Sequence, residues 1–112
     1  MNEAVKKRNT RIEYLYRDAS NYKCYKEFVV QGTFSSDEIL EILRCLDMGE
    51  YFIPAQVGMP GDIDWEWSDQ DDHPWFELSP FGFHETDEMP CGMSAAELLD
   101  NFRKAKNNWK VA

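Results

Sequence analysis

Lysine and arginine are missing from the middle of this chain. Between Arg44 and Arg103 lie 58 residues without either, and these carry 14 Asp and Glu residues, ten of them from Asp62 to Glu88. Such a stretch cannot neutralise itself with its own side chains. Its negative field repels phosphate backbones and acidic membrane surfaces and attracts basic protein surfaces. The charge therefore argues against direct nucleic-acid or membrane binding and favours a partner protein with a basic surface.

Cysteine and long apolar runs are scarce as well. The cysteines, Cys24, Cys45 and Cys91, are odd in number and widely separated, so nothing supports a disulfide framework. No signal peptide and no apolar run of about 18 residues is present. The expectation is a cytoplasmic protein in a reducing compartment.

The length and composition fit one domain. A chain of 112 residues with 43% apolar content is long enough for one core and too short for two. Residues 1–9 lack a patterned apolar face and are predicted to form a flexible basic arm. Residues 10–112 are predicted to form a single domain.

Two strands and two helices have clear signals. Thr10–Tyr16 alternates in polarity and Tyr22–Gln31 is rich in Tyr, Phe and Val, with a turn between them, which predicts an antiparallel hairpin. Capping boxes begin at Ser35 and Ser94. They predict a helix over Ser36–Met48 and a last helix running from Ser94 to Trp109.

The rest of the chain is less regular. Short strands are predicted at Glu50–Pro54, Trp75–Ser79 and Phe83–Thr86, and Pro54 either places the first of these at a sheet edge or ends it. A loop decorated with indoles is predicted over Asp62–Asp72. The fold class that follows is α+β, with a mainly antiparallel sheet of four to five strands and two helices on one face. Strand order and oligomeric state do not follow from the pattern.

Carboxylates alternate with tryptophans in and beside the predicted loop. Acids in this arrangement are able to occupy Lys and Arg groups that otherwise bind phosphates, and indole rings supply contact area of the kind found at interface hot spots. The opposite interpretation is a solvated loop whose tryptophans turn inward to the core. The candidate partner-binding residues are Asp62, Asp64, Trp65, Glu66, Trp67, Asp69, Asp71, Asp72 and Trp75.

Two other kinds of chemistry have weaker signals. The candidate metal ligands are Asp69, Asp71, Asp72 and His73, or His84, Glu85, Asp87 and Glu88. Their spacing fits neither an EF-hand loop nor a zinc site, so no metal or other cofactor is expected. Cys91 with either histidine is the available nucleophile and base, but nothing nearby activates the thiol. We therefore expect no enzymatic activity.

Three segments carry a resemblance to known proteins. They are Tyr16-Arg-Asp-Ala-Ser-Asn-Tyr22, Gly49-Glu-Tyr-Phe-Ile-Pro-Ala-Gln-Val-Gly58 and Asp71-Asp-His-Pro-Trp-Phe-Glu-Leu78. Over roughly residues 10 to 109 the chain resembles a family of small uncharacterised acidic proteins of bacteria and their mobile elements, which implies no activity. In size and acidity it is also similar to phage-borne anti-CRISPR inhibitors, a group united by role and not by fold.

Two hypotheses follow. In the first, the protein is an inhibitor that mimics DNA and covers the basic nucleic-acid-binding surface of a CRISPR or other defence nuclease. In the second, it is an accessory domain that binds a small ligand or a divalent metal at an aromatic and carboxylate pocket.

Overall fold

A long hairpin is the main element of the fold, which a computed structural model describes for residues 8–110. Strands β1 (Asn9–Arg17) and β2 (Lys23–Gln31) pair antiparallel, within one residue of the predicted bounds. In the hairpin turn, the carboxylate of Asp18 accepts hydrogen bonds from the N–H groups of Ser20 (2.9 Å) and Tyr22 (2.8 Å). This is the turn chemistry for which Asp is favoured.

The other edge of β1 is shared by two short strands. β4 (Phe76–Glu77) pairs with the end of β1 and β5 (Phe83–Thr86) with its start, and the 3-10 turn η1 (Pro80–Gly82) joins them. β3 (Tyr51–Phe52) pairs with β4, so the order is β2-β1-β4-β3, with β5 on β1. Over residues 8–110 the sheet therefore has five antiparallel strands.

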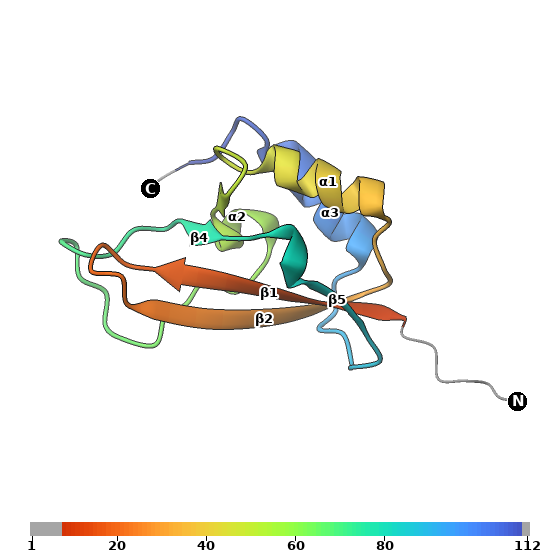
Figure 1. The fold of residues 1–112 in the computed structure, drawn as a ribbon, viewed down its shortest axis with the longest axis horizontal. Coiled ribbons are helices and arrows are strands. Elements are labelled where there is room, and N and C mark those ends of the chain that lie inside the picture. The colour runs from red at the N-terminus through yellow and green to blue at the C-terminus, as the bar shows by residue number, and fades with distance from the viewer. Residues whose placement is uncertain (1–7, 111–112) are drawn as a thin grey trace, which may run out of the picture.

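Two helices lie on one side of the sheet, as Figure 1 shows. They are α1 (Ser36–Cys45) and α3 (Ala95–Ala105), and both predicted capping boxes are formed, at Ser35 and at Ser94. Each serine side chain accepts from the N–H three residues later, whose glutamate accepts from the serine N–H in return. The predicted α+β class is confirmed.

Both helices end earlier than predicted. α1 stops at Cys45 and not at Met48, because Leu46 takes an extended conformation and is buried in the core. α3 stops at Ala105, and the chain then turns so that the Trp109 indole donates a 3.0 Å hydrogen bond to the carbonyl of Cys45. The predicted last turns of both helices are therefore absent, and the segment after α3 contacts the end of α1 instead.

A short third helix was missed. The strand predicted at Glu50–Pro54 is shorter than the predicted segment, and it lies at the edge of the sheet and ends before Pro54, as the proline predicted. Helix α2 (Pro54–Val57) begins there with proline in its first turn. Gly58 ends this helix in the left-handed conformation, at φ 86°. Only Tyr51–Phe52 of the predicted segment is strand.

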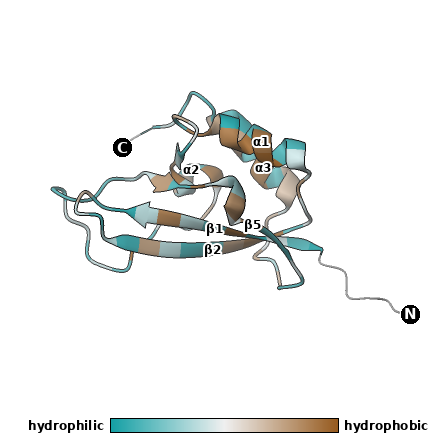
Figure 2. Ribbon diagram, viewed as in Figure 1, coloured by the Kyte–Doolittle hydropathy of each residue, from teal (hydrophilic) through white to brown (hydrophobic). Residues whose placement is uncertain are grey.

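The helices cover only part of the inner face of the sheet. Ile12, Tyr14 and Tyr16 point inward from β1 and are buried. Figure 2 shows hydrophobic residues on α1, α3 and the parts of β1 and β2 near them, whereas the hairpin turn and the loop beside it are mostly hydrophilic. Closer to that turn, the loop after α2 covers the inner face in place of the helices. Tyr14 Oη donates a 2.7 Å hydrogen bond to the carbonyl of Pro60 in this loop.

Most of the predicted basic arm lies outside the described residues. Within residues 8–110, Arg8 is exposed and Asn9 already belongs to β1. In the same range, no helix combines the length and apolar character needed to cross a membrane.

Candidate partner-binding surface

Residues Asp62–Asp72, the acidic loop, form neither helix nor strand, as predicted, and Asp72 fixes the end of the loop to β1. Tyr16 Oη donates a 2.5 Å hydrogen bond to Asp72 Oδ1, and Trp65 Nε1 donates to the same oxygen at 3.3 Å. The backbone N–H of Ser68 donates to Oδ2 at 2.8 Å. The hydrogen bond from Tyr16 lowers the pKa of Asp72, with burial opposing and the other donors assisting. Asp72 is thus a half-buried anchor of the loop and not part of its exposed charge.

His73 extends this anchor. Its backbone N–H donates to Tyr16 Oη (3.2 Å), and its ring Nδ1 lies 3.1 Å from the backbone N of Trp75. Because a backbone N–H only donates, Nδ1 accepts there, and Nε2 carries the hydrogen that reaches the Arg17 carbonyl at 2.8 Å. Both ring nitrogens therefore serve the local structure, which leaves neither for a metal or a catalytic base.

The tryptophans expected as contact residues differ in exposure. Trp67 is 51% exposed, and its Nε1 donates to Asp69 (2.8 Å), which fixes the orientation of the ring. Trp65 is half-buried against Tyr16, with ring centroids 5.9 Å apart. Trp75 is half-buried as well and meets Trp109 edge to face at 6.3 Å. The inward interpretation thus fits Trp65 and Trp75, and the outward one fits Trp67.

One loop acid has a counterion from outside the stretch that lacks Lys and Arg. Lys26, from the inner face of β2, forms a 2.9 Å ion pair with Asp62 and lowers the pKa of that carboxyl group. Asp64, Glu66 and Asp69 are exposed and form no ion pair within residues 8–110. These three acids have no direct counterion there, although Asp64 adds to the effect of Asp62 in raising the pKa of Lys26.

Asp71 joins the loop to the hairpin turn. Its carbonyl accepts from the N–H of Ala19 (2.9 Å), and its carboxylate lies 3.4 Å from Ser20 Oγ. The nine predicted residues therefore divide into an anchored group and an exposed group. We call the exposed residues of this set that form no ion pair within residues 8–110 the apex residues. They are Asp64, Glu66, Trp67 and Asp69.

The candidate metal and thiol sites are not assembled in residues 8–110. No group of three or more His, Cys, Asp and Glu side chains is placed there to hold a metal ion. His84 Nε2 lies 3.1 Å from Glu13, and Glu88 contacts Arg11 and Thr86. The Cys91 thiol donates to the Val29 carbonyl (2.8 Å) and contacts neither histidine by a hydrogen bond in this range.

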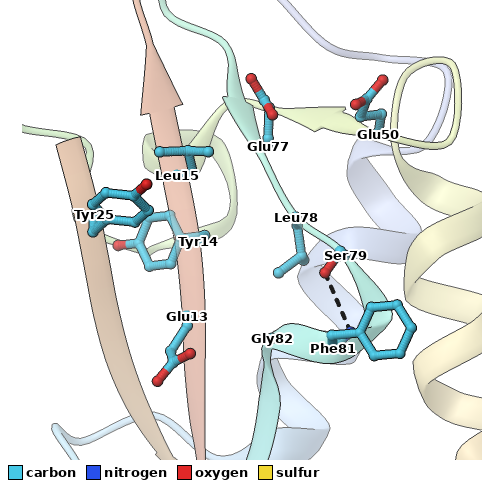
Figure 3. A pocket seen from close by; sticks show the side chains of 10 residues that line it. All are labelled: Glu13, Tyr14, Leu15, Tyr25, Glu50, Glu77, Leu78, Ser79, Phe81 and Gly82. Atoms are coloured by element: carbon cyan, nitrogen blue, oxygen red, sulfur yellow. Dashed lines mark hydrogen bonds between the residues drawn. The ribbon is translucent and has the colours of Figure 1, made fainter. Parts of the chain in front are cut away.

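Sequence reasoning missed a hollow of about 280 Å³ on the outer face of the sheet. Figure 3 shows the side chains of Leu15, Tyr25 and Leu78 along its middle, with Glu13 at one end and Glu77 at the other. Glu50 and the 85% exposed Phe81 also line it. Both end carboxylates already have cationic partners, because Glu13 lies 3.4 Å from Arg11 and Glu77 lies 3.0 Å from Arg17. Glu13 and Leu15 are two residues apart in a predicted strand, and this spacing was the signal that their side chains share the outward face.

A second hollow combines aromatic and carboxylate groups. Its volume is about 320 Å³, and Asp47, Met48, Tyr51, His73 and Trp75 line it. A pocket of this composition is what the ligand-binding alternative requires, and that alternative stays a prediction.

Comparisons with protein-family models, with curated proteins and with solved structures find no match to this chain. The resemblances to acidic bacterial proteins and to anti-CRISPR inhibitors stay predictions. Any functional conclusion therefore depends on the geometry of the molecule itself.

Proposed function

We propose that this protein binds a basic surface of a partner protein and blocks it. The observation that supports the proposal is the apex: Asp64, Glu66 and Asp69 are exposed around the open ring of Trp67, without an ion pair in residues 8–110. Exposed carboxylates attract Lys and Arg groups over a distance and speed the encounter with a basic surface. The indole adds the buried contact area on which interface affinity depends.

The anchors behind the apex favour this function further. Asp72, His73 and Asp71 hold the loop to β1 and to the hairpin turn through hydrogen bonds to backbone and side chains. A loop that is already ordered loses less conformational entropy when it binds. The apex residues are therefore presented in a fixed arrangement, which a solvated charge run without anchors lacks.

The partner class follows from the chemistry of the apex. Surfaces dense in Lys and Arg are above all those that bind nucleic-acid phosphates, and carboxylates compete for the same groups. A nucleic-acid enzyme is thus the proposed target, and a defence nuclease such as a CRISPR nuclease is an example. The protein acts in this proposal by mimicking the charge of DNA, and it contributes no catalytic group.

Matched charge variants test the proposal. The variant D64N/E66Q/D69N removes three apex charges with little change in side-chain size. The control D47N/E85Q/D87N removes three charges from exposed acids elsewhere that form no ion pair within residues 8–110. Both variants therefore have the same net charge, and a difference between them reports position and not total charge.

The measurement is capture of proteins from a bacterial lysate on the immobilised protein, with and without excess duplex DNA. We expect wild type and the control variant to capture the same basic proteins, which DNA or high salt releases, and the apex variant to lose them. Equal capture by all three proteins, or capture that DNA does not affect, would overturn the proposal.

A further inference from the structure

Strand β2 forms an outer edge of the sheet, as Figure 1 shows. Near its end this edge is covered: the N–H of Gln31 donates to the Met93 carbonyl (2.8 Å), and the carbonyl of Val29 accepts from the N–H of Cys91 (3.0 Å). The register with β1 is unbroken along the whole strand. Backbone groups of alternate residues in an antiparallel strand point to the same side, so the outward direction repeats every second residue.

The first half of the edge is uncovered. By this alternation the N–H and C=O groups of Lys23, Tyr25 and Glu27 point away from β1, and within residues 8–110 they have no hydrogen-bond partner. All three residues are exposed, Tyr25 to 75%. Lys23 and Glu27 also form no ion pair in that range. A free edge of this kind is a template for pairing with another strand.

The side chains along this edge are complementary to a second copy of themselves. Lys23 and Glu27 stand two residues before and two residues after Tyr25 and carry opposite charges. If two β2 strands pair antiparallel about a two-fold axis at Tyr25, each Lys23 faces the partner's Glu27 and the two tyrosines face each other. Directly opposed unlike charges and aromatic pairs both stabilise antiparallel strands. A two-fold interface requires this kind of self-complementarity.

We propose that two copies of this chain associate through the Lys23–Glu27 edge of β2, centred on Tyr25, and join their sheets. A lysine on an edge strand ordinarily deters pairing, but here the register places it opposite a glutamate. Lys26, on the other face, is already neutralised by Asp62. The association uses none of the apex residues, so it is independent of the proposed function.

The free stretch has clear limits. The hairpin turn at Asp18–Tyr22 ends it on one side, and the segment that covers Val29 ends it on the other. The interface is therefore short, and the dimer is expected to form in a concentration-dependent way. A strand from a different protein is the other possible occupant, and it predicts a monomer when the protein is pure.

Sedimentation equilibrium at low salt over a range of concentrations tests the proposal with charge swaps. We expect wild type to dimerise and K23E or E27K to weaken the dimer by about tenfold or more, because each turns two attractive pairs into two repulsive ones. The double variant K23E/E27K restores complementarity and dimerises like wild type. A mixture of the two single variants forms a heterodimer, although each alone is monomeric.

A backbone variant adds an independent readout. Tyr25→Pro removes the outward N–H at the centre of the interface, and proline is tolerated on an edge strand where its position faces solvent. We expect a folded monomer by circular dichroism and sedimentation. Any one of four results would overturn the proposal. Wild type is monomeric, K23E/E27K dimerises no better than K23E or E27K, the mixture of K23E and E27K stays monomeric, or Tyr25→Pro is dimeric.

Discussion

The hydroxyl of Tyr16 donates a 2.5 Å hydrogen bond to Asp72, a residue 56 positions further along the chain. The bond joins β1 to the end of the acidic loop, where Trp65 and Ser68 donate to the same carboxylate. An acid that by sequence belongs to a charged patch is therefore the structural anchor of that patch. The positions of the apex residues depend on it.

Replacing Tyr16 by Phe keeps the ring and removes this hydrogen bond. We expect a loss of about 1–3 kcal/mol in the free energy of unfolding, because partly buried polar groups lose their partner. Urea unfolding followed by circular dichroism measures the loss. Tyr22→Phe is the control, since Tyr22 is 69% exposed and its hydroxyl has no partner within residues 8–110. Equal losses of unfolding free energy in both variants would contradict a stabilising role of the Tyr16–Asp72 hydrogen bond.

Stability should decrease in acid through the carboxylates whose folded-state pKa is lowered. The hydrogen bond from Tyr16 lowers the pKa of Asp72 from its ordinary value of 3.8, and Arg103 lowers that of Glu41 from 4.5. A lowered pKa stabilises the folded state above the unfolded-state value, and this contribution is lost as the pH falls through the folded-state value. Urea midpoints measured from neutral pH down to about pH 2 should therefore decrease mainly below about pH 4.

The same series separates the two carboxylates. In Tyr16→Phe the acid-side decrease should be shallower than in wild type, because the main cause of the shift at Asp72 is gone. An unchanged pH profile in this variant would count against the hydrogen bond as that cause.

Gly82 lines the outer-face hollow and lies too close to β1 for a larger residue. A Cβ atom at this position would lie 2.3 Å from the carbonyl oxygen of Glu13, so Gly82→Ala must displace η1 from β1. We expect a destabilisation of about 1–3 kcal/mol, as for other overpacked sites. Gly61→Ala is the matched control, because its Cβ would make an ordinary 3.5 Å contact with Pro54. A thermal midpoint lowered equally in both variants would be the contrary result.

Trp67 should dominate the quenching of the protein's fluorescence by acrylamide. It is 51% exposed, whereas Trp65 and Trp75 are half-buried. We expect Trp67→Phe to leave a protein that acrylamide quenches less than wild type. Trp65→Phe should leave one that is quenched at least as strongly. If Trp65→Phe were quenched less than wild type and Trp67→Phe were not, Trp65 and not Trp67 would be the exposed indole.

Local signals predicted where the helices begin and not where they end. The capping boxes at Ser35 and Ser94 are complete within four residues, so the sequence carries the whole signal. The ends depend on tertiary contacts, such as the burial of Leu46 and the hydrogen bond from Trp109 to the Cys45 carbonyl. Helix α2 was missed because the apolar run before Pro54 is typical of a strand.

The candidate surface was predicted as a region but not residue by residue. Asp72 and Glu66 are equivalent by composition, and they differ only because Asp72 meets Tyr16 from another element. Lys26 neutralises Asp62 across 36 residues, which no local pattern reveals. Pairings made by the folding of distant segments therefore decide which charges stay free.

The most direct test of the account is a nuclear magnetic resonance titration of the isotope-labelled protein with an oligo-arginine peptide. We expect the largest shifts at the backbone amides from Asp64 to Asp69 and at the indole N–H of Trp67, decreasing as salt is raised. Shifts spread evenly over all exposed acids, or centred on the hollow between Glu13 and Glu77, would contradict the assignment of the apex as the binding surface.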